Sequence, residues 1–232
     1  MLIAIAAFVV SAIPSVAFYF WLKSLKAEEE YKENCKNALK RGMLTVFPVI
    51  LLSLSFTIIG RLLKIADINQ YLYDAYYKMI VLAFAEELAK FLTLKKFLKD
   101  KQFSWLDIIV YMVIIGIGFE IAESALYAIG TDVISMAVRG LTIMHGAFAY
   151  VMGRLYGKSL KTGKKIYAVL GFVIPWLMHG IYDFTLTEEI VDLYDWIPII
   201  PVSLAFISLV LIIQLVFFVR KARNKEMFTE LL

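Results

Sequence analysis

The sequence has few of the residues and motifs on which soluble enzymes rely. It contains a single cysteine, Cys35, which excludes an internal disulfide and a cysteine-based metal site. Only 19% of the 232 residues are charged. The HExxH pattern of common zinc proteases and the GxSxG pattern of serine hydrolases are absent, and so are glycine loops that would bind phosphate. The net charge of +4 comes without any nucleic-acid-binding motif, so we expect no nucleic-acid partner.

Hydrophobic residues dominate instead. They make up 61% of the chain, and the mean hydropathy is +0.77. A membrane-spanning helix needs about 20 apolar residues, and the apolar runs follow one another too closely to leave room for a soluble domain. We therefore predict an all-α, polytopic membrane helix bundle that forms one integral membrane domain over residues 1–232 and lies in the cell membrane. Hydropathy predicts about seven spans: 2–22, 43–60, 72–94, 104–128, 133–155, 166–187 and 197–219.

The basic residues predict the orientation of these spans. Lysine and arginine gather after spans one, three, five and seven, whereas the connection after span six is acidic. Because cytoplasmic loops carry the excess of Lys and Arg, the N-terminus is predicted outside and the C-terminus in the cytoplasm. The first span has no basic segment before it and no convincing cleavage site, so we expect a retained anchor.

Span 72–94 is interrupted by charges, above all Glu86, Glu87 and Lys90. A charged residue at a helix centre costs ~2.5–3.5 kcal/mol on insertion scales, whereas each large apolar residue returns only ~0.3–0.6 kcal/mol. These side chains must therefore be paired, protonated or turned towards a hydrated interior.

Further ionisable residues lie in the next three predicted spans. They are Glu120, Glu123, Arg139, His145, His179 and Asp183. Glu86 and Lys90, Glu120 and Glu123, and His179 and Asp183 are three or four residues apart, so each pair shares one helix face. Counting along the helices places the glutamates and histidines at overlapping depths in the middle and outer half of the membrane, which predicts a shared polar cavity.

Such a cavity suits the activation of water. Carboxylates crowded in a dry site titrate together, which leaves one ionised as a general base and another protonated as an acid. The two histidines could stabilise an oxyanion, or they could join a glutamate as ligands of a metal that activates water. Both chemistries remain open at this point.

Four short motifs resemble those of the PrsW family of intramembrane proteases. "EELAK" from Glu86 to Lys90 looks like its EExxK motif, and "FEIAE" from Phe119 to Glu123 resembles its FExxE motif. "MHGAF" around His145 and "HGIYD" from His179 to Asp183 resemble its histidine motifs in order and spacing. The family is related to the CAAX prenyl endopeptidases and the bacterial immunity-type membrane proteases. The resemblance covers residues 86–183, within a predicted helical core of about 72–187.

The resemblance implies an endopeptidase that cleaves a membrane-anchored protein in or near the lipid bilayer. The family's best-known role is first-site cleavage of an anti-sigma factor. Carried onto this sequence, the resemblance assigns the water-activating base to Glu86 and Glu87, and oxyanion stabilisation or metal ligation to His145 and His179. The supporting residues would be Lys90, Glu120, Glu123 and Asp183. A divalent metal such as zinc, if one is used, would be bound by His145, His179 and Glu120.

Two other classes of function use similar residues. Intramembrane carboxylates and histidines also form the proton or ion pathways of transporters, which predicts polar residues through the whole membrane thickness and broken helices or internal repeats. A non-catalytic membrane scaffold would keep the same residues for packing alone.

Overall fold

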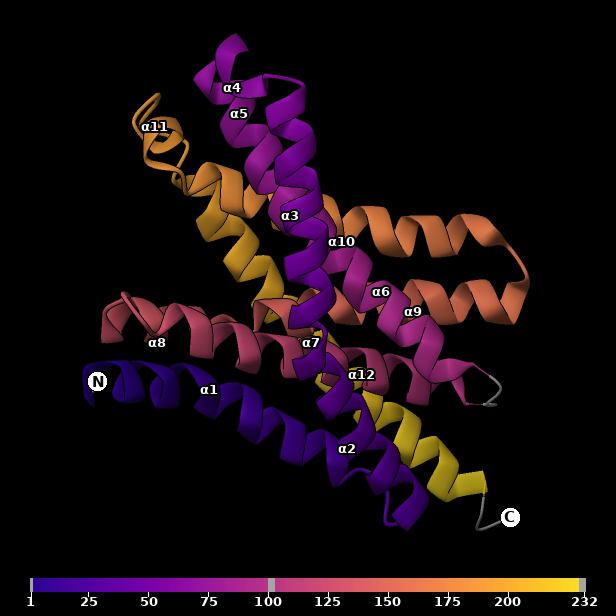
Figure 1. The fold of residues 1–232 in the computed structure, drawn as a ribbon. Helices are drawn as coiled ribbons and strands as arrows, with labels where there is room; N and C mark the ends of the chain where they lie inside the picture. The colour runs from indigo at the N-terminus through magenta and orange to yellow at the C-terminus, as the bar shows by residue number, and fades with distance from the viewer. Residues whose placement is uncertain (1, 100–102, 230–232) are drawn as a thin grey trace.

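The structure is a computed structural model that describes residues 2–99 and 103–229, and within these ranges every regular element is helical. The predicted all-α class is therefore confirmed. The elements are α1 (Leu2–Lys23), α2 (Glu29–Leu44), α3 (Val46–Leu62), α4 (Ile65–Ile68), α5 (Gln70–Tyr76), the π-helix η1 (Tyr77–Phe84), α6 (Ala85–Leu98), α7 (Trp105–Tyr127), α8 (Val133–Thr142), α9 (Met144–Thr162), α10 (Lys165–Thr185), α11 (Glu188–Val191) and α12 (Ile199–Thr229) (Figure 1).

Six helical runs in the described ranges are long and apolar enough to cross a membrane. They are Leu2–Lys23, Glu29–Leu62, Trp105–Tyr127, Val133–Thr162, Lys165–Thr185 and Ile199–Ala222. The protein is thus a multi-pass membrane protein. The predicted span 72–94 lies within one unbroken helical run, α5–η1–α6, but its charged residues set it apart from these six. A total of seven spans and the orientation of the termini stay predictions.

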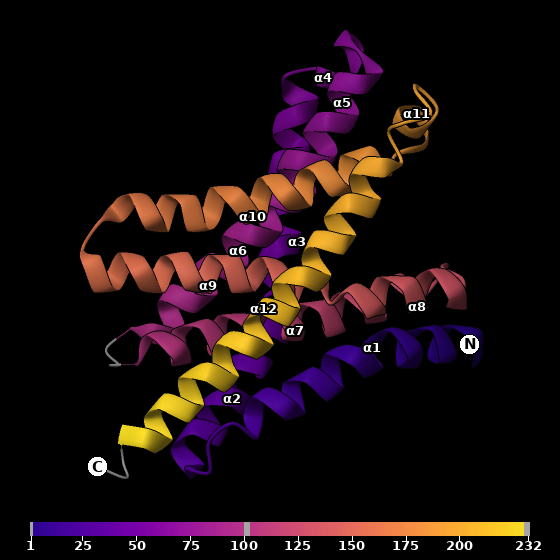
Figure 2. The same ribbon diagram turned by 180° about the vertical axis from the view of Figure 1, so that it is seen from behind.

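Helix α7 forms the centre of the bundle. Every residue from Ile108 to Glu120 is buried, as expected of a helix that is apolar on all sides. It packs mainly against α9 and α2. Figures 1 and 2 show α1 beside α8 along one edge, the α9–α10 hairpin at the opposite edge and α12 crossing the bundle diagonally. The largest apolar cluster surrounds α7 and includes Cys35, which is buried on α2.

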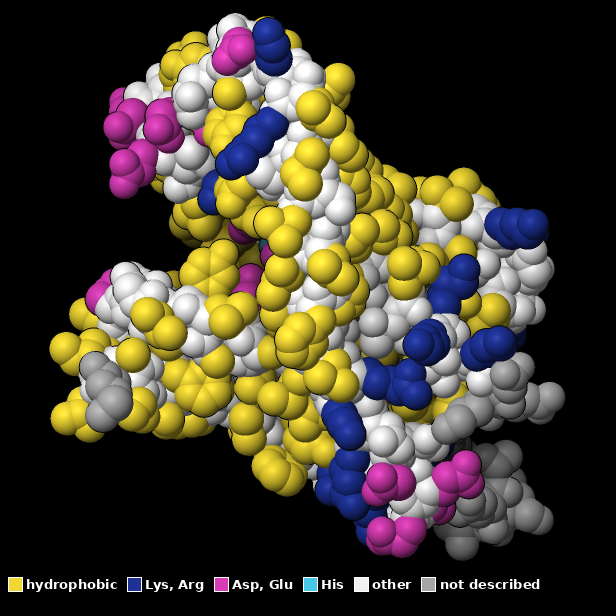
Figure 3. All heavy atoms as spheres, in the orientation of Figure 1, with side chains coloured by type: hydrophobic (Ala, Val, Ile, Leu, Met, Phe, Trp, Pro, Cys, Tyr) yellow, Lys and Arg dark blue, Asp and Glu magenta, His cyan; other side chains and the backbone are white. Residues whose placement is uncertain are grey.

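Charge is distributed unevenly over the surface. In Figure 3 many lysine and arginine side chains gather around α2, α6 and the α9–α10 turn, with a group of acidic side chains beside them at α2, whereas acidic side chains gather around α11 at the far end, with a few basic ones nearby around α3–α5. Hydrophobic side chains cover much of the surface between these ends, including exposed residues of α3 such as Leu51 and Leu54. Hydrophobic side chains between two ends that carry charged residues are typical of a membrane protein.

Candidate active site

Four helices bring the eight predicted site residues together. Glu86, Glu87 and Lys90 come from α6, Glu120 and Glu123 from α7, His145 from α9, and His179 and Asp183 from α10. All of them are buried except Asp183, which is partly exposed. The predicted shared cluster therefore exists in this fold.

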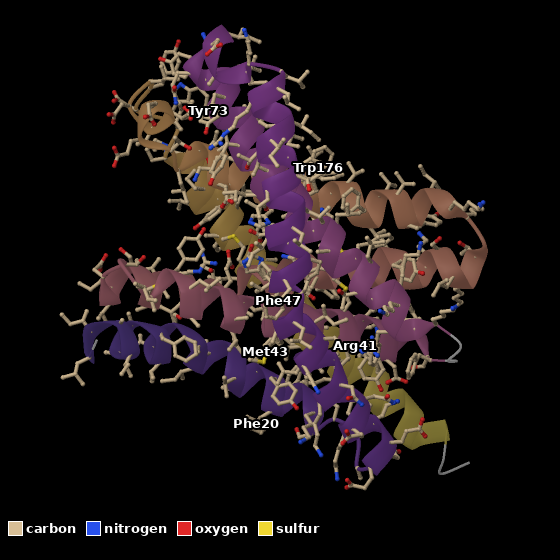
Figure 4. All side chains as sticks on the ribbon, viewed as in Figure 1. Phe20, Arg41, Met43, Phe47, Tyr73 and Trp176 are labelled. Carbon is tan, nitrogen blue, oxygen red and sulfur yellow. The ribbon has the colours of Figure 1, made fainter. Side chains whose placement is uncertain are left out.

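A π-helix leads directly into the glutamate pair. η1 ends at Phe84, two residues before Glu86. Trp176 Nε1 on α10 donates a hydrogen bond to Met79 O at 2.7 Å, and Ser53 Oγ on α3 donates one to Val81 O, also at 2.7 Å. Figure 4 labels Trp176 where α10 meets this part of the chain. Side chains of two neighbouring helices thus hydrogen-bond to the π-helix. Such π-helical turns are frequent at functional sites.

His145 lies at the start of a new helix, which the sequence did not predict. Residues 133–155 were expected to form one continuous span, but Ile143 adopts a left-handed conformation with φ of 42° and separates α8 from α9. This conformation is strained for a β-branched residue. α9 can come close to α7 because Gly116 has no side chain: a Cβ there would lie 2.6 Å from His145 O.

The two adjacent glutamates have different surroundings, as their separation of about 100° around the helix requires. Glu87 is fully buried; its Oε1 accepts hydrogen bonds from Lys90 Nζ at 2.6 Å and from His179 Nδ1 at 3.0 Å. Glu86 Oε2 is buried without a hydrogen-bond partner, 3.8 Å from His179 Nε2 and 4.0 Å from Lys90 Nζ. Glu87 Oε2 also has no partner, but the two hydrogen bonds at Oε1 fix Glu87 within the site, whereas of the two Glu86 is the glutamate that lines a cavity.

His145 is hydrogen-bonded at both ring nitrogens. Its Nδ1 lies 2.9 Å from Lys90 Nζ, and its Nε2 lies 2.7 Å from Glu123 Oε2. Because an ammonium group can only donate, Nδ1 accepts from Lys90 and Nε2–H donates to Glu123. The Lys90 ammonium also lies 4.5 Å from the centre of the Phe119 ring, a cation–π distance. Lys90 thus joins the EExxK segment to both α7 and α9.

Sequence analysis gave Arg139 and Phe119 no role, although both contact the site. Arg139 on α8 forms an ion pair with Glu123. The Phe119 ring packs edge-on against the His145 ring at 5.1 Å. Phe119 could have been included because it opens the FEIAE motif. Arg139 could not, because its distance from Glu123 depends on how α8 folds back towards α7.

A small polar cavity lies on the other side of the two histidines. A cavity of about 30 Å³, enough for one water molecule, is lined by Glu120, Arg139, Thr142, Met144, His145, His179, Tyr182 and Asp183. Glu120 Oε2 has no hydrogen-bond partner, and His179 Nε2 lies 3.4 Å from Asp183 Oδ2. The carboxylates of α7 and α10 therefore face the same small polar space.

The structure offers a possible site for a divalent metal. Glu86, His145 and His179 are all buried, and one ligand atom from each lies within 4.8 Å of the others. Two histidines and one glutamate form the protein ligand set of a common class of catalytic zinc site, and the unpartnered Glu86 Oε2 fits this role. Glu86 replaces Glu120, the glutamate that sequence analysis placed in the ligand set. Metal binding through His145 would displace Lys90 or Glu123 from its ring.

Comparisons with known proteins agree with the motifs. Residues 37–218 match the family model described as PrsW family intramembrane metalloprotease. Three proteins named Protease PrsW are similar over much of their length. The protein from Shouchella clausii is 30% identical over 63% of this chain and 67% of its own. Those from Geobacillus kaustophilus and Clostridioides difficile are 28% and 26% identical, over 76% and 82% of this chain and 77% and 81% of their own. No solved structure matches.

Proposed function

Because the chain belongs to the PrsW family of intramembrane proteases, we propose that it hydrolyses a peptide bond of a membrane-anchored protein with a water molecule activated at Glu86. One observation carries this proposal. Oε2 of Glu86 and Oε2 of Glu87 are both buried without a hydrogen-bond partner, but of the two glutamates only Glu86 lines an open cavity, and its Oε2 lies 3.8 Å from His179 Nε2. A base must reach the water it deprotonates, and Glu86 is placed to do so.

In this proposal the other residues hold and complement Glu86. Glu87 binds His179 at Nδ1, so that Nε2 faces the same space as Glu86. Lys90 balances the charge of Glu87 in a place without solvent. His179 would then contact the reacting water or the carbonyl oxygen, where a fixed polar group stabilises developing charge.

The donor set Glu86, His145 and His179 also suits a divalent metal such as zinc. A metal there would supply a Lewis acid and lower the pKa of bound water. Glu87 would then orient His179 through its other ring nitrogen, as carboxylates beside metal-bound histidines do. Glu86 is required in both forms, as base or as ligand.

The family resemblance makes a membrane-anchored anti-sigma factor our candidate substrate, cut first at this site. In the predicted orientation the site lies in the middle and outer half of the membrane, which suits cleavage near the outer end of the substrate's anchor. Helical peptide bonds are shielded by their own hydrogen bonds, so the anchor must unwind locally before it is cut.

A transporter is less consistent with the described structure. Apart from Asp74 on α5, the buried acidic, basic and histidine side chains gather around α6, α7, α9 and α10, whereas the part of α7 from Ile109 to Ile115 belongs to the apolar cluster. A proton or ion path requires polar groups through the whole thickness. Among the described residues, no series of buried ionisable groups leads from the site along this part of α7.

The test is Glu86→Gln in the purified protein, with cleavage of a panel of single-pass membrane reporters as the readout. Loss of a general base lowers the rate by ~10²–10⁴-fold, while the melting temperature in detergent should change little. Glu188→Gln, at an exposed position on α11, is the matched control and should cleave at the wild-type rate. Wild-type cleavage by Glu86→Gln would disprove the proposal.

Metal content separates the two chemical forms. Elemental analysis of the purified protein, repeated on His145→Ala, shows whether one metal per chain is bound and then lost. Metal loss together with activity loss would assign metal chemistry to Glu86, His145 and His179. Full activity in a chelator-treated, metal-free preparation would assign the reaction to glutamate-activated water.

A further inference from the structure

An apolar groove runs beside the candidate site, between α3, the η1–α6 run and the second half of α7. Its volume is about 410 Å³. We call it the α3 groove and define it by its lining residues: Val46, Val49, Ile50, Ser53, Leu54, Thr57, Tyr77, Val81, Leu82, Glu86, Phe119, Glu123, Leu126 and Tyr127. Figure 3 shows a hollow beside α3, with acidic side chains visible in its depth between hydrophobic walls.

The groove adjoins the candidate active site. Among the described residues, Glu86 and Glu123 are the charged ones that line it, and both belong to the candidate site. Phe119, which contacts Lys90 and His145, forms part of the same wall. A chain segment in the groove would therefore lie against Glu86.

The groove also opens sideways and towards one end. Ile50, Leu54 and Leu126 line it and are 46%, 55% and 57% exposed, so the bilayer has access to it from the side. A second cavity of about 180 Å³ shares Thr57, Tyr77 and Val81 with it and ends among Arg61, Lys64 and Asp67. Tyr73, labelled in Figure 4, lies at this polar end.

Two contacts keep α3 and the opposite wall in place. Ser53 Oγ donates to Val81 O at 2.7 Å, and Tyr76 OH donates to Phe56 O at 2.5 Å. Near the second contact Gly60 allows the close approach, because a Cβ there would lie 2.6 Å from the Tyr76 ring. The groove is therefore a built space between fixed points.

We propose that the α3 groove binds the substrate: it takes an apolar, uncharged segment at the outer end of the membrane anchor, and Ile50, Leu54 and Leu126 select the side chains beside the scissile bond. This inference rests on the proposed function. Apolar walls at membrane depth disfavour a charged side chain relative to a leucine. The groove's volume lies within the range of ligand-binding pockets, so it holds several side chains of an unwound segment.

The first arm of the test compares two tryptophan substitutions on α3. Leu54→Trp narrows the groove, whereas Leu51→Trp adds the same bulk at a lipid-exposed position of α3 that does not line it. The reporters carry Ala, Leu, Phe or Asp at the outer end of one anchor. We expect wild type and Leu51→Trp to cleave the Leu and Phe reporters at least tenfold faster than the Asp reporter. In Leu54→Trp the cleavage rate of the Phe reporter, relative to that of the Ala reporter, should fall at least tenfold.

The second arm does not depend on cleavage. A photoreactive amino acid replaces Leu54 or Leu51 in the Glu86→Gln background, and both variants are illuminated with the Leu reporter in vesicles. We expect at least fivefold more reporter captured from position 54. Equal capture at both positions, or only lipid adducts at 54, would overturn the groove assignment. Absence of cleavage by wild type, with selective capture at 54, would refute the protease proposal and leave the groove intact.

Discussion

The two parts of helix α7 bury different chemistry in the same way. From Ile109 to Ile117 every residue of the helix is buried, and all of them except Gly116 belong to the largest apolar cluster. One turn later Glu120 and Glu123 are 2% and 7% exposed, almost as deeply buried. One helix therefore supports an apolar core along most of its length and a charged cluster at its end.

The difference shows what each region needs from its neighbours. Apolar side chains need only close packing, which α2 and α9 supply. A buried carboxylate is expensive unless charges and hydrogen bonds compensate it; Glu123 has both Arg139 and His145. Such an arrangement adds little net stability, so its presence in the membrane favours a chemical role.

The largest effect on the charged cluster is expected from Lys90→Met. Lys90 is completely buried and bonded to Glu87 and His145, so its loss leaves the buried Glu87 carboxylate without its lysine partner and with only the hydrogen bond from His179. Removal of one partner of a buried ion pair costs about 3–5 kcal/mol. We expect a large drop in the free energy of unfolding in mixed micelles and loss of activity.

Two controls accompany this variant. Lys95→Met, at an exposed position on the same helix, should change stability by less than about 0.5 kcal/mol. Adding Glu87→Gln to Lys90→Met removes the stranded charge and should restore a large part of the stability, without restoring activity. Equal stability of Lys90→Met and wild type would show that the charged cluster does not depend on Lys90.

A smaller effect is expected from Trp176→Phe. The substitution keeps an aromatic ring on α10 but removes the N–H that binds Met79 O in the π-helix. Loss of this bond costs about 1–3 kcal/mol, and a shifted η1 would displace Glu86. We expect kcat to fall about tenfold with little change in KM. Trp196→Phe, at a 56% exposed position, should have no effect. A rise in KM with unchanged kcat for Trp176→Phe would contradict a positioning role.

The sequence was sufficient to predict the helical class and the residues that meet at the site. Spacing of three or four residues placed Glu120 with Glu123 and His179 with Asp183 on shared faces, and this information is local to each helix. The membrane makes such residues easy to recognise, because an ionisable side chain there requires a partner.

The geometry within the cluster could not be predicted in the same way. The π-helix depends on hydrogen bonds from Trp176 and Ser53, which are far from it in sequence. The break at Ile143 occurs at a β-branched residue for which the left-handed conformation is intrinsically unfavourable. Which glutamate pairs with Lys90 likewise follows from the position of α10, since His179 and Lys90 share Glu87 Oε1.

The mildest prediction tests the apolar part of α7. Ile114→Val removes one methyl group at a position with no exposure, four residues before Gly118 and away from every ionisable group of the site. The cost should be about 0.5–1.5 kcal/mol of unfolding free energy, with reporter cleavage at the wild-type rate because the charged cluster keeps its partners. Ile58→Val, 57% exposed on α3, provides the reference for a methyl group lost to lipid. A tenfold loss of activity in Ile114→Val would mean that packing along α7 holds Glu120 and Glu123 in position, and the two parts of the helix would then act as one unit.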